Sequence, residues 1–236
     1  MQETHVQSAP HNIEIENARF MSGVYKWMAI GLLLTAGVSF YISTSKEIAG
    51  MIFGNKILFW GLIIAQLGAV FFLSARIKKI SALTATLTYL AYSALTGLTF
   101  SFIFLVYTQE SIFSAFLLTS ISFIGLSTFG YITKKDLGPI GTFCHMGLWG
   151  LIGFALISLF FPNLMSGTAS KVYSLAGIVI FSGLTAYDTQ KIKNGNIIGN
   201  EGSEEDHKET ILGALTLYLD FINLFLMILR LMGRRR

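Results

Sequence analysis

Charged residues are scarce in this sequence. Asp, Glu, Lys and Arg together make up 13% of the 236 residues, whereas a soluble domain usually contains about 25%. There are only three prolines, while hydrophobic residues reach 53%. The hydrophobic residues come in blocks of about 20, the length that a helix needs to cross roughly 30 Å of hydrocarbon. Because a helix satisfies its backbone hydrogen bonds within one segment, an all-α polytopic membrane protein is predicted.

Cysteine and the common enzyme motifs are also scarce or absent. Cys144 is the single cysteine, which excludes an intrachain disulfide and a cysteine-based metal site. The sequence contains no HExxH, GxSxG, P-loop or dinucleotide-binding motif. We therefore expect neither an enzyme nor a bound cofactor.

The N-terminus and the net charge exclude two further classes. The first 20 residues lack the basic start and apolar core of a cleaved signal peptide, and they are expected to remain as a soluble tail. The net charge is +4, but the basic residues lie at the ends of apolar blocks, which indicates membrane topology rather than nucleic-acid binding.

Seven apolar segments can be recognised. They cover residues 23–43, 57–75, 81–107, 111–132, 140–161, 172–192 and 210–231. The polar connector 194–210 separates the last two segments, because its acidic residues cannot enter the membrane. The predicted organisation is a cytoplasmic tail, residues 1–22, followed by a seven-helix transmembrane domain, residues 23–236.

Lys and Arg at the helix ends predict the orientation. Ten lie on the side of the N-terminal tail and only three in the opposite connectors, which places the N-terminus in the cytoplasm. Seven crossings would put Arg230 and the final arginines 234–236 outside, against this rule. The last segment is then either re-entrant or a full crossing, and its length without a central Pro or Gly favours the crossing.

Small residues are expected where helices approach closely in lipid. They are Gly147, Gly150 and Gly153 in the fifth segment and Ala85, Ser93, Ala94 and Gly97 in the third.

Two carboxylates interrupt the apolar segments. Of the 13 Asp and Glu residues, only Asp188 and Asp220 lie within such segments. An Asp at the centre of a membrane helix costs about 2.5–3.5 kcal/mol, so it usually faces a partner or a cavity. Both lie in the cytoplasmic half of neighbouring helices, and we expect them to meet.

Two carboxylates held this closely cannot both ionise comfortably, so the pair is expected to share a proton. When both are ionised, their oxygens suit a hard cation such as Ca²⁺. Asp188 and Asp220 are therefore a candidate site for pH sensing and Ca²⁺. The alternatives are an ion pair of Asp188 with Lys191, three residues later, and a structural role for Asp220.

Arg76 and His145 are predicted near the same end of the bundle. Arg76 either extends to lipid phosphate or pairs with the carboxylates as a latch. His145 either titrates near neutral pH or caps a helix beside the headgroups.

The segments GIVIFSGLTAYDTQKIK and GALTLYLDFINLFLMILRLMG closely resemble the signature of the Bax inhibitor-1 family. The resemblance extends from about residue 20 to the end of the chain. It implies a seven-helix fold with a central last helix and a pH-sensitive calcium leak controlled by a di-aspartyl unit. Asp188 and Asp220 stand at the matching motif positions, and Arg76 is similar in placement to the family's latch arginine.

Three functions were weighed. The first is a proton-regulated Ca²⁺ leak in a bacterial inner membrane. The second is a regulatory protein that binds a membrane protease or another membrane partner. The third is an intramembrane aspartyl protease, which the sequence disfavours because Leu217, Tyr218 and Leu219 precede Asp220 where a G-x-G-D pattern is expected.

Overall fold

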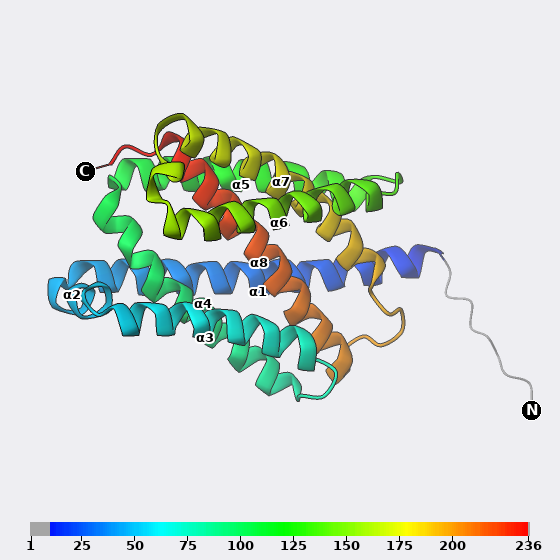
Figure 1. The fold of residues 1–236 in the computed structure, drawn as a ribbon. Coiled ribbons are helices and arrows are strands. Elements are labelled where there is room, and N and C mark those ends of the chain that lie inside the picture. Colours follow the sequence, from blue (N-terminus) through cyan, green and yellow to red (C-terminus); the bar gives the residue numbers. More distant parts are fainter. Residues whose placement is uncertain (1–9, 236) are drawn as a thin grey trace, which may run out of the picture.

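A computed structural model describes residues 10–235, and every named element in it is a helix (Figure 1). The helices are α1 (Pro10–Thr44), α2 (Lys46–Gly54), α3 (Lys56–Arg76), α4 (Ala82–Val106), α5 (Gln109–Ile132), α6 (Gly138–Phe160), the 3₁₀ helix η1 (Pro162–Met165), α7 (Gly167–Asn194) and α8 (Glu204–Met232). The predicted all-α fold is confirmed.

Seven of these helices are long and apolar enough to cross a membrane, namely α1 and α3 to α8. Each contains one of the seven predicted segments or most of it. Residues 10–22 of the predicted tail belong to α1, while residues 1–9 lie outside the described part of the chain. The short α2 was not predicted, and it occupies the connector between the first two crossings.

Polar residues mark the start of several helices. The side chains of Asn55, Ser81, Thr108 and Ser203 accept hydrogen bonds from backbone N–H groups in the first turns of α3, α4, α5 and α8. Such caps satisfy donors that the helix itself leaves free. The positions where the apolar segments begin are thus determined locally.

The last helix is the core of the bundle. In its most apolar stretch, 72% of the residues are buried, and α8 packs against α1, α4, α5 and α7. Figure 1 shows α8 crossing between the other helices. The predicted central position of the last helix is confirmed.

The C-terminus distinguishes a full traverse from a re-entrant helix. The backbone N–H of Arg234 donates to Ser111 Oγ (2.9 Å), and the N–H of Thr108 donates to the carbonyl of Arg234 (3.1 Å). These contacts tie the C-terminus to the connection between α4 and α5, at the opposite end of the bundle from the start of α1 (Figure 1). The helix α8 therefore traverses the bundle, as expected; the orientation in the membrane stays a prediction.

The small residues only partly mark helix contacts. A Cβ on Gly97 would overlap Val38 of α1, and one on Gly147 would overlap Ile180 of α7. Nothing lies within 4 Å of the corresponding point at Gly150 or Gly153. The prediction that these two glycines mark a helix contact was wrong, because they lie on parts of α6 that no neighbour covers.

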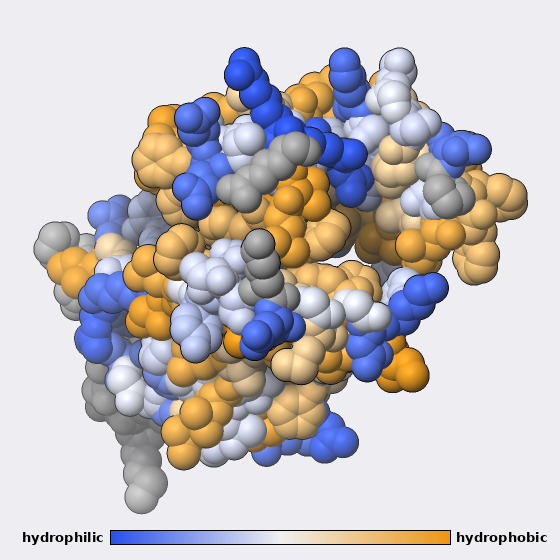
Figure 2. Space-filling view, turned by 90° about the vertical axis from the view of Figure 1, so that its left-hand side faces the viewer, coloured by the Kyte–Doolittle hydropathy of each residue, from blue (hydrophilic) through white to orange (hydrophobic). Residues whose placement is uncertain are grey.

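The outer surface is largely hydrophobic. Large apolar side chains such as Phe71, Ile121, Phe143 and Val179 are each more than 60% exposed, as expected where lipid replaces protein as the neighbour. In Figure 2, which looks at the bundle from the α2 end, hydrophobic atoms cover much of the surface and a hollow separates its upper and lower parts.

Candidate functional site

Four consecutive residues near the end of α7 contact four different parts of the molecule. Tyr187 packs on Gly141 of α6, Asp188 faces α8, Thr189 bonds Ser127 of α5, and Gln190 bonds the connector between α5 and α6. Successive helix positions differ by about 100° in direction, so a central helix can address a different neighbour with each residue. The four residues of the sequence YDTQ thus attach the end of α7 to several neighbouring elements at once.

Gln190 has the most complete set of partners in this group. Its amide accepts a hydrogen bond from the N–H of Leu137 (2.9 Å) and donates one to the carbonyl of Lys135 (2.8 Å). Lys193 follows one turn later, and its amine donates to the carbonyl of Tyr131 at the end of α5 (2.8 Å). These bonds hold the backbone around Asp188 in place.

The facing part of α8 is arranged in the same way. Tyr218 is fully buried, its hydroxyl lies 2.6 Å from Thr35 Oγ1 of α1, and its ring contacts Tyr89 and Tyr92 of α4. Phe221 packs against Phe123 of α5, with ring centroids 5.5 Å apart. Between them in sequence, Asp220 faces α7.

Asp188 and Asp220 come together in the structure. Their side chains lie within hydrogen-bonding reach of each other, and they are only 7% and 5% exposed. Asp220 Oδ2 is buried without a hydrogen-bond partner among the described residues. A buried carboxylate oxygen in this state needs a proton or a cation, since an unpaired charge in a low-dielectric interior is costly.

Two basic residues lie close enough to Asp188 to interact with its charge, Lys191 and His145. Lys191 is exposed at the end of α7, and its amine lies 5.8 Å from the centre of the Tyr187 ring. His145 Nδ1 lies 2.8 Å from the carbonyl of Gly141, and its ring meets that of Tyr187 edge to face. His145 thus contacts the backbone of its own helix and the ring of Tyr187.

Arg76 lies apart from this group. It is exposed at the end of α3, a helix that packs on α2 and α4. Among the described residues, no ion pair joins Arg76 to either carboxylate. Its role as a latch stays a prediction.

Asp188 and Asp220 are not part of a larger cluster of metal-binding side chains among the described residues. In residues 10–235, no group of three or more His, Cys, Asp and Glu side chains could hold a metal ion. Ca²⁺ takes six to eight oxygen ligands, so Asp188 and Asp220 would supply only a minority of them. Water and backbone carbonyls would have to supply the others.

A chain of hydroxyl groups that was not predicted from the sequence lies beside the pair. Tyr25 Oη lies 2.6 Å from Ser127 Oγ, which lies 2.9 Å from Thr189 Oγ1. This chain joins α1, α5 and α7. Thr189 stands next to Asp188 in the YDTQ motif, but nothing in the sequence pointed to Tyr25, 164 positions away.

Comparisons with known proteins agree on one family. Residues 17–236 match the family described as Inhibitor of apoptosis-promoting Bax1 (Bax1-I). The chain is 48% identical over 218 residues to the "Inner membrane protein YbhL" of Escherichia coli, with 92% of each chain covered. It is 42% identical over 218 residues to an uncharacterized protein of Borreliella burgdorferi, covering 92% of this chain and 93% of that one. An uncharacterized protein of Deinococcus radiodurans is 38% identical over 216 residues, covering 92% and 90%. None of these three is named as an enzyme.

Proposed function

The chain belongs to the Bax inhibitor-1 family of membrane proteins, and from this premise we propose that it conducts a passive Ca²⁺ leak across the inner membrane, controlled by protonation of Asp188 and Asp220. The observation that supports the proposal most is the buried contact between these two carboxylates in the core of a membrane bundle.

The leak would be controlled because protons and Ca²⁺ compete for the same carboxylate oxygens of Asp188 and Asp220. With one proton shared, the pair carries a single negative charge and is stable in a buried place. Loss of that proton leaves two adjacent negative charges, which attract a divalent cation or a basic side chain. The pH and the cation concentration would therefore act on one site.

The test is flux into liposomes. Purified protein is reconstituted in vesicles that contain a Ca²⁺-sensitive dye, and uptake is measured between pH 6 and pH 8. We expect the rate to change over this range, and we expect the change to disappear in Asp188→Asn and in Asp220→Asn. Asp136→Asn is the matched control, because Asp136 is exposed on the connector between α5 and α6. A flux that is independent of pH, or unaltered by both core substitutions, would contradict the proposal.

The direction of the pH effect separates two mechanisms. If proton and Ca²⁺ simply compete, raising the pH frees the carboxylates and the flux increases. If a basic side chain binds the ionised pair and closes the path, raising the pH lowers the flux.

A double-mutant cycle identifies the basic residue in the second case. As a latch, Arg76→Ala should increase the leak at neutral pH and should add nothing in an Asp188→Asn background. Charged groups in contact usually couple by about 0.5–3 kcal/mol, which is measurable as non-additive rates. Lys191→Ala serves as the comparison, because Lys191 already lies near Asp188. Additive effects for Arg76 would exclude it as the latch.

A further inference from the structure

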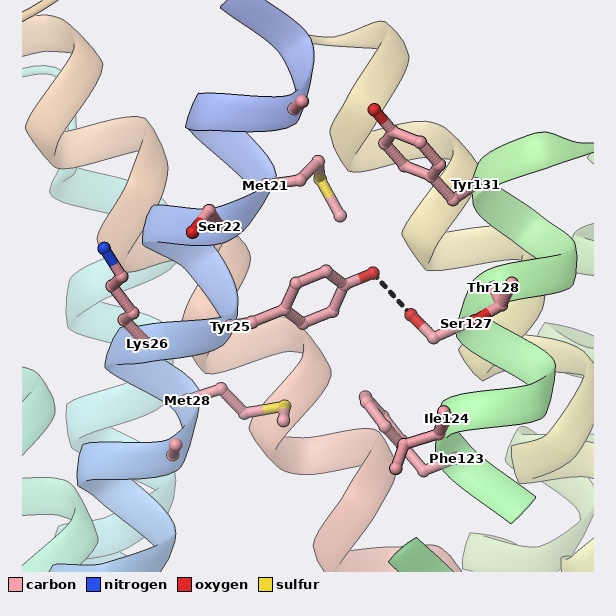
Figure 3. A pocket seen from close by; sticks show the side chains of 12 residues that line it. Met21, Ser22, Tyr25, Lys26, Met28, Phe123, Ile124, Ser127, Thr128 and Tyr131 are labelled. Atoms are coloured by element: carbon pink, nitrogen blue, oxygen red, sulfur yellow. Dashed lines mark hydrogen bonds between the residues drawn. The ribbon is translucent and has the colours of Figure 1, made fainter. Parts of the chain in front are cut away.

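Two cavities of the molecule, one of them the largest among the described residues, lie along one seam between α1 and α5. One cavity of about 720 Å³ is bounded by Met21, Tyr25 and Met28 of α1 and by Phe123 and Ser127 of α5, among others (Figure 3). A second, of about 460 Å³, continues along the same two helices towards Phe40 and Phe113 and reaches Phe225 of α8. Volumes of roughly 300–1,000 Å³ are typical of small-molecule sites.

The seam exists because α1 and α5 belong to different packing groups. The helix α1 packs mainly on α4, whereas α5 packs mainly on α7, and α8 lies between the two groups. Among the described residues, one side-chain hydrogen bond joins α1 to α5, that between Tyr25 and Ser127. Figure 3 shows the Tyr25 ring reaching across the gap to Ser127.

The hydroxyl chain at this bridge has a defined direction. Thr189 donates its proton to the carbonyl of Thr185 (2.7 Å), so Ser127 must donate to Thr189, and Tyr25 must donate to Ser127. Each hydroxyl proton is thereby used. The bridge consequently offers no free donor to a polar ligand, and the remaining lining of the seam is mostly apolar.

The seam runs along α1, one of the helices long and apolar enough to cross a membrane. Its lining residues on α1 extend from Ala18 to Phe40, and at 1.5 Å per residue this distance is about 33 Å, close to the thickness of the hydrocarbon layer. An apolar groove at that depth opens towards acyl chains rather than water. The larger cavity occupies the half of the bundle that contains the start of α1.

Basic residues gather where α5 ends beside this cavity. Lys134 and Lys135 are exposed two and three residues after the last residue of α5. Lys193 lies with its amine 4.8 Å above the ring of Tyr131, which lines the cavity. On α1, by contrast, the amine of Lys26 points away from the gap (Figure 3). Three lysines therefore lie near the end of α5 where Tyr131 lines the cavity: Lys193 comes from α7, and Lys134 and Lys135 from the connector after α5.

We propose that the larger cavity binds an acyl chain of an anionic phospholipid whose phosphate lies at Lys134, Lys135 and Lys193. The apolar lining of the cavity would contact the acyl chain, and the surrounding bilayer would be the source of the lipid. The lysines would favour a lipid with a negatively charged headgroup. Each basic residue near a membrane surface contributes about 1 kcal/mol to the attraction of anionic lipid. The inference does not depend on the proposed ion flux, since it concerns binding alone.

A photoreactive lipid tests the site directly. The protein is reconstituted in phosphatidylcholine vesicles that contain a small fraction of phosphatidylglycerol with a diazirine in its acyl chain, and the labelled residues are mapped by mass spectrometry. We expect labels on α1 and α5 within residues 18–29 and 123–131. Ala29→Trp, which fills the cavity, should remove most of that labelling, whereas Ala65→Trp on the exposed side of α3 should not. Equal labelling of the two segments in wild type and Ala29→Trp would overturn the acyl-chain site.

Removal of charge tests the headgroup. Wild-type protein should be labelled more by phosphatidylglycerol than by phosphatidylcholine with the same reactive chain. In the double variant Lys134→Gln and Lys135→Gln this preference should fall on the order of tenfold. The Gln190 bond uses the backbone of Lys135 and is retained. Lys78→Gln with Lys79→Gln, two exposed lysines after α3, is the matched control. Loss of preference in both double variants, or in neither, would overturn the assigned phosphate position.

Discussion

The helices α3 and α8 look alike by composition and differ in nearly every structural respect. Both are apolar enough to cross a membrane, and α3 is slightly the more hydrophobic of the two. Yet only 6% of the most apolar stretch of α3 is buried in the protein, against 72% of that of α8. Hydrophobicity alone therefore does not decide which helix of a membrane bundle forms its core.

Polar side chains account for the difference. In lipid, an apolar surface gains little from burial against other helices, whereas a polar group needs a partner. The helix α8 carries Tyr218 and Asp220 at mid-length, and both find partners on other helices. In α3 the comparable residue is Gln66, which bonds its own helix at Leu62 and reaches Thr99 of α4. A single neighbouring helix, α4, is therefore enough to satisfy the polar side chain of Gln66, whereas the polar side chains of α8 need partners on several helices.

The largest contrast should come from truncating matched leucines. Leu224 of α8 is fully buried, and Leu67 of α3 is 55% exposed. We expect Leu224→Ala to lower the free energy of unfolding by about 2–4 kcal/mol, since it leaves a cavity that the surroundings cannot close. Leu67→Ala should change it by less than about 0.5 kcal/mol, because lipid fills the space. Unfolding by SDS in mixed micelles measures both, and similar losses would mean that burial in protein does not set the cost.

Matched glycines should give a smaller contrast. A Cβ on Gly130 of α5 would overlap the backbone carbonyl of Ala186 of α7, whereas Gly68 of α3 has nothing within 4 Å. Gly130→Ala should cost about 1–3 kcal/mol through overpacking. Gly68→Ala should be neutral or stabilising by up to about 1 kcal/mol, from helix propensity. Unfolding by SDS in mixed micelles compares the free energies of unfolding of the two variants. A Gly130→Ala variant as stable as the wild type would show that α5 and α7 can move apart without cost.

The smallest contrast concerns a single hydrogen bond. Tyr218→Phe removes the hydroxyl that bonds Thr35, while Tyr41→Phe alters a tyrosine of α1 that is 66% exposed. Side-chain hydrogen bonds between membrane helices contribute about 0.6 kcal/mol on average, so we expect a loss of that order for Tyr218→Phe and none for Tyr41→Phe. Thr35 also donates a hydrogen bond to the carbonyl of Ser93 (2.8 Å), so Thr35→Val removes two bonds. If Thr35 and Tyr218 act as a pair, the combined variant should lose less than the sum of the two single variants.

Both candidate carboxylates were visible in the sequence for one reason. Asp188 and Asp220 are costly in apolar segments, so a local rule was enough to single them out. The hydroxyl chain was not visible, because Tyr25, Ser127 and Thr189 are ordinary residues for a membrane helix and bond one another only through tertiary packing. The sequence also could not show that α3, which carries Arg76, packs on α2 and α4 rather than on the helices of the two aspartates.

The sequence by itself determined the number of membrane-spanning helices and their approximate limits, because the length and apolarity of each segment are local properties that the bilayer selects. It also determined that the two aspartates had to find partners. Only the tertiary structure decided which faces meet. A Cβ on Gly147 would overlap α7, whereas one on Gly150 would have nothing within 4 Å, and cavities separate α1 from α5 along their seam. These outcomes depend on the fit between segments far apart in the chain, and the hydrophobicity of each single segment carries no information about that fit.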